Sequence, residues 1–325
     1  MSKALVASAS GELRFGGRPF PRLIAEAGED AMKRFIEFFT ANIRNPNTRA
    51  AYVRAVGQFC TWCEGRKFSL DLLEPVVIAA YVEEIGQRLS KPSVKQHLAA
   101  IRMLFDYLVV GQIMPMNPAS SVRGPKHVVR RGKTPVLSPE DARRLLDSID
   151  TTALIGLRDR ALIAIMVYSF ARISAVVGMS VEDFYRNGKR YWFRFQEKGG
   201  KFHEVPAHHN AEAYVDAYLA AAGFGSEQKT PLFRTVRGKT GRLNGNRLNR
   251  FEAFQMVKRR VKAAGLSSRI CNHSFRATGI TTFLLNGGSL EHAQAIAAHE
   301  SPRTTKLYDR TQDEITLDEV ERILI

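Results

Sequence analysis

Apolar residues recur at helical spacing through the first third of the chain, once a less regular beginning has been passed. Residues 1–27 are rich in glycine, serine and proline without a periodic apolar pattern, so we treat them as an N-terminal arm. Beyond them, apolar positions three or four apart predict a small helical bundle over residues 28–115. Its helices are predicted to start near Glu29, after the capping pair Asn47 and Thr48, at Pro75 and at Ser93, and the last two to end near Leu89 and Val110.

The periodic pattern stops between Pro115 and Pro139, where proline, glycine and basic residues become frequent. Few apolar contacts can form in such a segment, so residues 116–137 are predicted to be a linker. Its end is marked by Ser138, which can cap a helix whose first residue is Pro139. The basic residues in and beside the linker are Arg123, Lys126, Arg130, Arg131, Lys133, Arg143 and Arg144.

The remainder of the chain, residues 138–325, mixes helical and strand patterns and is predicted to be a second domain. Its predicted helices are 139–149, a buried helix from Leu157 to Met179, and helices after Pro206 that are interrupted at 223–231 and 286–288. Its predicted strands are Arg190–Gln196 and Lys201–Val205, joined by a turn at Gly199 and Gly200.

The composition is that of a globular protein with two cores. The chain has 325 residues, of which 45% are hydrophobic and 25% charged. No run approaches the roughly 18 apolar residues of a membrane-spanning helix, and the N-terminus has no targeting pattern, so we expect a cytoplasmic protein with no membrane partner. Cys60 and Cys63 lie in a predicted helix without a further Cys or His pair at zinc spacing, so we expect core thiols and no metal site.

Charge adds a candidate partner. The chain has 48 basic and 32 acidic residues, a net charge of +16, and residues 229–276 alone hold 13 Lys or Arg and one acid, Glu252. Such a surface attracts a polyanion, and nucleic acid is the commonest one in the cytoplasm. The alternatives are a basic surface that serves only solubility, and a membrane surface, which is not favoured because no strongly amphipathic basic helix with aromatic anchors is present.

Residues suited to phosphate chemistry follow one another in the second domain. His273 and Arg276 are three apart in a predicted helix, so their side chains share one face. His299 comes 23 residues after Arg276, and Tyr308 nine residues after that. Ser301 can cap a helix that carries Tyr308 about two turns from its start. Singly, each of these residues is more often structural than catalytic.

Together with two earlier residues, this order resembles the tyrosine recombinase, or phage integrase, family over about Asn45 to Asp309. The family pattern is an Arg after the first long helix of the catalytic domain, a Lys in a β-turn, His-x-x-Arg, a Gly-His-like pair and a Tyr nine residues later. The matching residues are Arg172 in SFARISAVVGM, Lys198 in QEKGGKFHEVP, with Lys201 as its alternative, His273 and Arg276 in HSFRATG, His299 in AAHESP and Tyr308 in TTKLYDR.

The chain departs from this family pattern at three places. The acid that usually stands three residues after the first Arg is Ala175, which puts the support of neighbouring groups in doubt. The Gly usual before the last His is Ala298, which we expect to cost only the room of a methyl group. The segment from Tyr168 to Ala171 replaces the commoner Thr-Gly-Leu, and none of the changes removes a catalytic group.

The resemblance implies a mainly α fold of the α+β kind: an N-terminal helical, SAM-like core-binding bundle and an α-rich catalytic domain with a small antiparallel β-sheet. It implies cleavage and rejoining of duplex DNA through a 3′-phosphotyrosine, without cofactor, ATP or metal, because the phosphotyrosine stores the bond energy. The implied roles are phosphate binding by Arg172 and Arg276, ionisation of the Tyr308 nucleophile assisted by His273, protonation of the leaving 5′ oxygen by Lys198, and a hydrogen bond from His299 to a non-bridging oxygen.

The implied partner is double-stranded DNA, held between the two domains, and the implied assembly is a homotetramer on two duplexes. We expect DNA contacts at helix starts and in the linker, with ordinary helix caps as the alternative. The candidates are Thr48, Arg49, Ser93, Lys95, Gln96, Lys126, Arg130 and Arg131. The tail 313–325 has apolar residues at helical spacing and is expected to pack on its own domain or on a neighbouring protomer.

Two other functions stay open at this point. A type IB topoisomerase would share the chemistry but relax supercoils without a defined site, and a non-catalytic DNA-binding regulator would share only the charge. The sequence leaves open the target site, the choice among integration, excision, resolution and transposition, and any need for accessory DNA-bending proteins.

Overall fold

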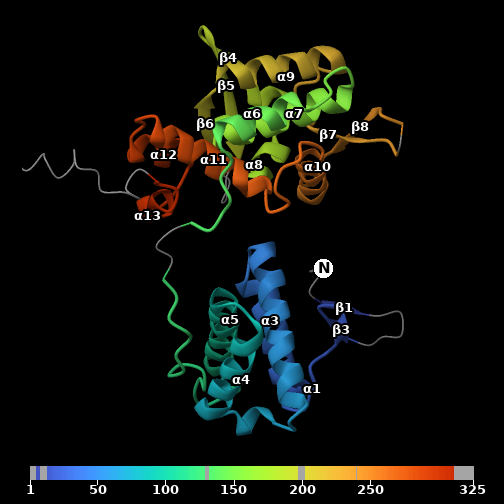
Figure 1. Ribbon diagram of the computed structural model, residues 1–325. Coiled ribbons are helices and arrows are strands. Elements are labelled where there is room, and N and C mark those ends of the chain that lie inside the picture. Colours follow the sequence, from blue (N-terminus) through green and yellow to red (C-terminus); the bar gives the residue numbers. More distant parts are fainter. Residues whose placement is uncertain (1–4, 8–12, 129–131, 197–201, 239, 311–325) are drawn as a thin grey trace, which may run out of the picture. The chain divides into compact units, whose positions relative to one another are not determined.

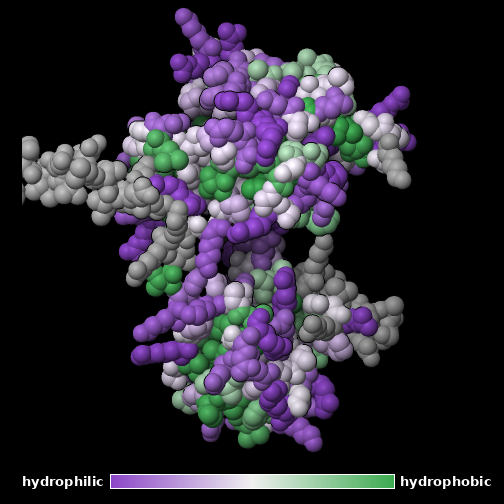
Figure 2. All heavy atoms as spheres, in the orientation of Figure 1, coloured by the Kyte–Doolittle hydropathy of each residue, from purple (hydrophilic) through white to green (hydrophobic). Residues whose placement is uncertain are grey.

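The computed structural model of the chain divides into two compact units, Met1–Val128 and Val129–Ile325 (Figure 1). The structure describes residues 5–7, 13–128, 132–196, 202–238 and 240–310. Hydrophilic residues cover much of the visible face of each unit, with smaller apolar areas between them (Figure 2). Among the described residues, no helix is both long and apolar enough to span a membrane.

The N-terminal unit is a helical bundle with a small antiparallel sheet of strand order β1-β2-β3. Its elements in chain order are β1 (Leu5–Ala7), β2 (Leu13–Phe15), β3 (Arg18–Pro19), α1 (Arg22–Ala25), α2 (Glu29–Glu37), a π-helical turn (Phe38–Asn42), α3 (Pro46–Glu64), a 3-10 turn (Leu70–Leu72), α4 (Pro75–Arg88) and α5 (Lys91–Val110). The helical bundle predicted from the periodicity is therefore confirmed.

Two helix starts in this unit differ from the prediction. The cap of α3 is Asn45, whose side-chain oxygen accepts hydrogen bonds from the backbone N–H groups of Asn47 and Thr48, at 2.9 and 3.2 Å. Pro46 then occupies the first turn, where its missing N–H costs nothing. Helix α5 likewise begins before the predicted Ser93, because Pro92 can occupy its first turn.

The core of the N-terminal unit is rich in phenylalanine. Phe35, Phe39 and Phe59 are almost fully buried. The rings of Phe35 and Phe39 pack edge to face. Phe15, from the segment treated as an arm, joins them with its ring centroid 4.9 Å from that of Phe35. Cys60 is buried with a free thiol, as is Cys63, so the expectation of core thiols is confirmed.

The start of the predicted linker packs on helix α5. Arg102 Nε donates to the carbonyl oxygen of Ala119 at 2.9 Å, and a second nitrogen of the same guanidinium donates to the carbonyl of Val122. Asn117 Nδ2 returns a hydrogen bond to the Arg102 carbonyl oxygen at 3.0 Å. Ala119 and Val122 are buried, so this part of the chain belongs to the N-terminal unit's core.

The C-terminal unit combines helices with two small antiparallel sheets, β4-β5-β6 and β7-β8. Its elements in chain order are α6 (Pro139–Asp147), α7 (Leu154–Tyr168), α8 (Ile173–Gly178), a 3-10 turn (Val181–Asp183), β4 (Phe184–Asn187), β5 (Arg190–Gln196), β6 (Phe202–Pro206), α9 (His209–Ala222), β7 (Arg234–Val236), β8 (Leu243–Arg247), α10 (Arg250–Ala263), α11 (Asn272–Leu285), α12 (Leu290–Ile296) and α13 (Pro302–Lys306). The mainly α fold with a small sheet is as expected.

The long helix predicted from Leu157 to Met179 is wrong in one respect, because the helix is interrupted between α7 and α8. The backbone of Phe170 is left-handed, with a φ of 55°, and its ring is buried against Phe283. Apolar residues on both sides of the break face the same core, so periodicity alone carries no signal of it. The predicted cap of α6 is confirmed, since Ser138 accepts from the Asp141 N–H at 3.1 Å.

The strand prediction is incomplete. The two predicted strands pair as β5 and β6, with Phe193 opposite Val205, but the sheet also contains β4. The turn predicted at Gly199 and Gly200 lies outside the described residues. The helical prediction after Pro206 is wrong over the β7–β8 hairpin, which projects from the unit in Figure 1. Its strands are so polar that apolar and polar residues do not alternate clearly.

A buried ion network fastens α7 to α10. Asp159 is 1% exposed, and its Oδ1 accepts two hydrogen bonds from Arg158, at 3.0 and 2.7 Å. Its Oδ2 accepts two from Arg260, at 2.9 and 2.7 Å. Arg158 also donates to the carbonyl oxygen of Arg234 at 2.8 Å, so one carboxylate organises three elements.

Replacing Asp159 by Ala should lower the free energy of unfolding by about 3–5 kcal/mol, because two buried or half-buried guanidinium groups lose the carboxylate they share. Denaturant unfolding followed by tryptophan fluorescence and circular dichroism would measure the loss. Arg144→Ala, which breaks an exposed pair with Asp141 in the same unit, is the matched control and should cost less than about 1 kcal/mol. Equal, small losses in both variants would contradict a structural role for the network.

Candidate active site

Five of the six residues predicted to be catalytic come together in the C-terminal unit. Arg172 is the N-cap of α8, and His273 and Arg276 lie one turn apart near the start of α11. His299 lies between α12 and α13, and Tyr308 follows α13. The charges of Arg172 and Arg276 act on the pKa values of all three other groups, which requires the five side chains to be close neighbours.

Arg276 is the buried centre of this group, with only 1% of its surface exposed. One terminal nitrogen of its guanidinium donates to the carbonyl oxygen of Phe170, in the break between α7 and α8. The other terminal nitrogen donates to the carbonyl oxygen of Ala297 at 2.6 Å, just after α12. The same side chain therefore holds two loops that are far apart in sequence.

Both of these loops contain a left-handed residue that is not glycine. Phe170 has a φ of 55° and Ala298 a φ of 47°. These are the positions where the family pattern commonly has Gly, and left-handed backbone costs an ordinary residue about 1–2 kcal/mol. Our expectation that Ala298 costs only the room of a methyl group is therefore wrong, because the requirement at this position is one of backbone conformation.

Tyr308 is nearly buried and points its hydroxyl at His273. The distance from Tyr308 Oη to His273 Nε2 is 2.9 Å. The helix that was expected to carry Tyr308 is shorter than predicted: Ser301 caps it, but α13 ends at Lys306 and Tyr308 stands in the turn beyond. Thr281 Oγ1 fixes that turn by donating to the Tyr308 carbonyl oxygen at 3.0 Å.

His299 also lies beside the tyrosine ring. Its own ring is parallel to that of Tyr308, with the centroids 6.0 Å apart. His299 is 7% exposed, and its Nδ1 is 2.8 Å from the hydroxyl of Thr305. Burial, with the nearby positive charges of Arg276 and Arg172, lowers the pKa of His299 to about 3, so the ring is neutral at neutral pH.

The electrostatics of the site favour neutral histidines beside a phenol. Burial lowers the pKa of His273, and the charges of Arg276 and Arg172 lower it further. Burial raises the pKa of Tyr308, while the two guanidinium groups lower it. A neutral His273 can accept a proton from the phenol, and two fixed positive charges can stabilise the phenolate that remains.

The structure says less about the remaining predicted site residues. Lys198, Arg130 and Arg131 lie outside the described residues. The other candidates for DNA contact have exposed or half-buried side chains at the starts of two helices or in the linker: Thr48, Arg49, Ser93, Lys95, Gln96 and Lys126. Ala175 is buried in an apolar core, so a carboxylate there would be surrounded by apolar side chains.

The basic stretch 229–276 is not a uniform surface. Arg234 pairs with Glu227, Arg260 belongs to the Asp159 network, and Arg247 donates to the carbonyl oxygens of residues 177 and 179. Since Arg276 is also buried, part of the positive charge that the sequence suggested for a partner stabilises the C-terminal unit itself.

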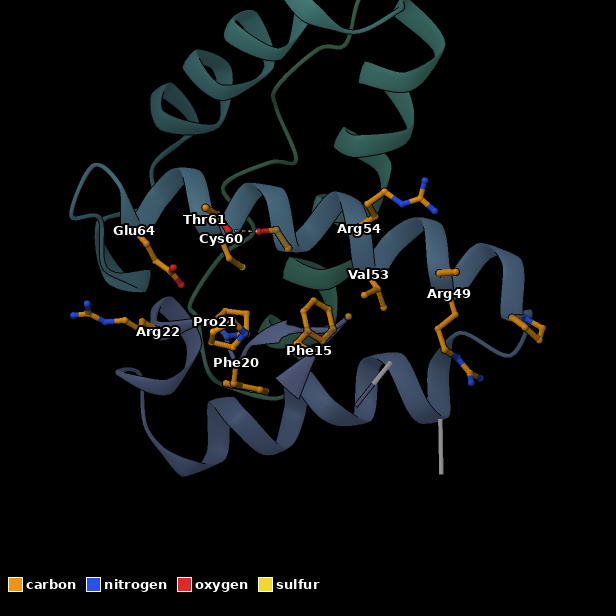
Figure 3. A pocket seen from close by; sticks show the side chains of 15 residues that line it. Phe15, Phe20, Pro21, Arg22, Arg49, Val53, Arg54, Cys60, Thr61 and Glu64 are labelled. Atoms are coloured by element: carbon orange, nitrogen blue, oxygen red, sulfur yellow. Dashed lines mark hydrogen bonds between the residues drawn. The ribbon is translucent and has the colours of Figure 1, made fainter. Parts of the chain in front are cut away.

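A hollow of about 850 Å³ opens in the N-terminal unit (Figure 3). Phe15 and Val53 line it together with Arg49, whose Nε donates to the carbonyl oxygen of Ile43 at 2.9 Å. A second hollow of about 940 Å³ lies beside Tyr168 in the C-terminal unit. None of the residues predicted to be catalytic lines either hollow. Within the described ranges, no three His, Cys, Asp or Glu side chains gather as metal ligands would.

Sequence reasoning missed the residues that hold the site in place. Thr281 and Thr305 are buried and bond to Tyr308 and His299, yet single threonines in helices carry no distinctive signal. Gly279 is also structural: a Cβ at this position would lie 2.0 Å from the carbonyl oxygen of Val167, so α11 and α7 touch through their backbones. In the sequence, only the small size of the residue that follows HSFRAT could have indicated this close contact.

The chain matches two family models. Residues 135–314 match the phage integrase family, and residues 32–111 match the phage integrase N-terminal SAM-like domain. Tyrosine recombinase XerC of Pelobacter propionicus is 29% identical over 81% of this chain and 84% of the relative. Tyrosine recombinase XerD of Chlorobaculum tepidum is 26% identical over 87% of this chain and 92% of the relative.

Solved structures share the fold. A lambda integrase dimer bound to a COC′ core site has a TM-score of 0.67 at 16% identity, covering 88% of this chain and 98% of that one. XerH recombinase bound to difH substrate, in a pre-cleavage complex, has a TM-score of 0.66 at 18% identity, covering 93% of this chain and 95% of that one.

The chain therefore belongs to the phage integrase family and is a site-specific tyrosine recombinase, an enzyme that cleaves and rejoins DNA. The alternatives of a type IB topoisomerase and a non-catalytic regulator are not favoured, because the curated relatives are tyrosine recombinases.

Replacing Ala298 by Gly should raise the free energy of unfolding by about 1 kcal/mol, because Gly adopts the left-handed backbone without strain. Denaturant unfolding would measure the gain. Ala297→Gly is the matched control: its φ of −79° is ordinary, so that variant should be less stable than the parent. Destabilisation by both substitutions would contradict strain at Ala298.

Proposed function

We propose that Tyr308 is the nucleophile of this recombinase and that His273 is its general base. The observation that carries the proposal is the 2.9 Å contact between the phenol oxygen and His273 Nε2 beside two guanidinium groups. In the cleavage step the phenol proton passes to His273, the bond from the phenolate oxygen to phosphorus forms, and the bond from phosphorus to the 5′ oxygen breaks. The product is a 3′-phosphotyrosine and a free 5′ hydroxyl.

Arg172 and Arg276 would bind the non-bridging oxygens of the attacked phosphate. Negative charge builds up on these oxygens in the pentacoordinate transition state, and guanidinium groups held in advance stabilise it without reorganising. The backbone acceptors of Arg276 support this role, because they fix the direction in which the guanidinium faces. His299 would add one neutral hydrogen bond to the same phosphate.

Lys198 would supply the proton for the leaving 5′ oxygen, as the family resemblance implies. Lys198 falls between the end of β5 at Gln196 and the start of β6 at Phe202, and these two strands belong to the C-terminal unit. The reverse sequence, with a different 5′ hydroxyl as nucleophile, rejoins the strands. The reaction so written conserves the bond energy and calls for no cofactor, ATP or metal.

Duplex DNA is the substrate that we propose, bound by both units. The starts of α3 and α5 would contact the backbone through Thr48, Arg49, Ser93, Lys95 and Gln96, and the linker through Lys126, Arg130 and Arg131. Exposed or half-buried polar and basic side chains at these helix starts support the assignment. The similarity to a lambda integrase and a XerH recombinase that were solved with DNA supports it as well.

We propose further that the active assembly is a homotetramer on two duplexes, formed in the cytoplasm. A lambda integrase tetramer bound to a Holliday junction shares the fold of this chain, with a TM-score of 0.66. The tail 313–325, which lies outside the described residues, is the segment proposed to join protomers.

Tyr308→Phe should abolish covalent attachment to DNA and leave binding within about twofold of the parent, because it removes one oxygen atom from a buried ring. The variant itself can select binding duplexes from random DNA, and nicked forms of these then serve as suicide substrates. A covalent adduct that survives denaturing electrophoresis is the readout, with EDTA present throughout.

Tyr214→Phe removes the hydroxyl of a tyrosine in the same unit that is not part of the site, and it should form adducts normally. Adducts formed by the Tyr308→Phe protein would contradict the assignment of the nucleophile. Adducts that require a divalent metal would contradict the proposed reaction.

The cleavage rate should depend little on pH near neutrality. His273 accepts a proton only when neutral, and burial lowers its pKa from the ordinary value of about 6.5. The single-turnover rate at subsaturating DNA, which reports the free enzyme, should therefore stay constant from about pH 7.5 to about pH 6.5 and fall only below that. A twofold loss already at pH 6.5, with unchanged DNA binding, would indicate an unshifted base and count against this environment for His273.

A further inference from the structure

The hydroxyl of Thr305 is placed to control one of the site's histidines. Thr305 is fully buried in α13, three residues before Tyr308, and its Oγ1 is 2.8 Å from His299 Nδ1. In the part of the chain that the structure describes, this imidazole nitrogen is the one hydrogen-bond partner of the hydroxyl. Its neighbour Thr304 is exposed, so the two threonines of the helix have different surroundings.

The direction of this hydrogen bond decides where the imidazole carries its hydrogen. A neutral ring has one N–H, and the nitrogen opposite it is an acceptor. If Nδ1 donated to Thr305, the threonine would have to bury its own O–H without an acceptor, which is costly. If Thr305 donates to Nδ1, the hydroxyl is satisfied and the ring hydrogen stays on Nε2.

The surroundings of the other ring nitrogen, Nε2, are consistent with a hydrogen bond donated by Thr305. Within the described ranges, His299 Nε2 has no hydrogen-bond partner, although it belongs to a ring beside Tyr308 and the two guanidinium groups. A hydrogen on Nε2 is available to an oxygen of an incoming phosphate, whereas a lone pair there would repel it. Burial and the nearby positive charges keep the ring neutral, so the tautomer alone decides whether it donates.

We propose that Thr305 is a positioning residue that holds His299 in the Nε2–H tautomer and in one ring orientation, so that the histidine meets the phosphate as a donor. The inference deepens the proposed function and rests on it for the donor role, but the tautomer is a property of the protein without DNA. Since α13 carries Thr305 and leads directly into Tyr308, one short helix sets both the nucleophile and the donor.

The test compares Thr305→Val, which keeps the shape and removes the hydroxyl, with Thr305→Ser, which keeps the hydroxyl. The ¹⁵N shifts of the histidine rings are recorded on the full chain without DNA, and His299→Gln identifies the signals. The parent and Thr305→Ser should contain His299 only as Nε2–H, and Thr305→Val should contain a mixture of tautomers. Thr304→Val, the neighbouring exposed position, should leave the signals unchanged.

The same proteins are then assayed for single-turnover cleavage. Thr305→Val should cleave about tenfold more slowly at unchanged DNA affinity, the lower end of the loss seen when the hydrogen-bond partner of a metal-ligating histidine is removed. Thr305→Ser should lie within about twofold of the parent. A parent ring that carries its hydrogen on Nδ1, or a Thr305→Val ring that stays entirely Nε2–H, would overturn the proposal. If Thr305→Val contains a mixture of tautomers but cleaves as fast as the parent, Thr305 does hold the Nε2–H tautomer. That result would refute the donor role of His299 instead.

Discussion

The burial of one guanidinium group is the constraint on which the candidate active site depends. Arg276 is almost inaccessible to solvent, and a buried cation is tolerated only where its N–H groups find acceptors. Two backbone carbonyls, of Phe170 and Ala297, accept hydrogen bonds from its two terminal nitrogens. The loops that carry these carbonyls must therefore stay where the guanidinium needs them, and the same loops lead to Arg172 and to His299. One charge thus fixes the spacing of residues separated by more than a hundred positions.

This arrangement uses backbone strain and packing together. Phe170 and Ala298 adopt left-handed conformations next to the acceptor positions, and the ring of Phe170 is held by burial against Phe283. Close approach of α11 to α7 at Gly279 leaves the backbone no room to relax. Strained backbone that is held in place by the packing around it is typical of functional sites. Burial lowers the pKa of both histidines in the site, and the positive charges so fixed lower it further.

The features that the sequence predicted are those with local signals. Ser138 before Pro139 marks a helix start, periodic apolar residues mark the bundle, and the order of polar residues from His273 to Tyr308 marks the candidate site. The features that it could not predict depend on partners far along the chain. The break at Phe170, the polar β7–β8 hairpin and the burial of Arg276 have no pattern of their own, since each follows from contacts that only the folded chain makes.

The separate cores of the two units have a consequence for how such a chain can exchange parts with its relatives. All described residues of the candidate active site belong to the C-terminal unit, whose apolar core shares no residue with that of the N-terminal unit. Arg102 binds the chain as far as Val122, so the N-terminal core is complete by that point. A hybrid gene joined within residues 123–128 would exchange the whole N-terminal unit and disturb neither core. Recombination between related genes at this short stretch would thus exchange the DNA contacts proposed for α3 and α5, while the described residues of the candidate active site stay together in one unit.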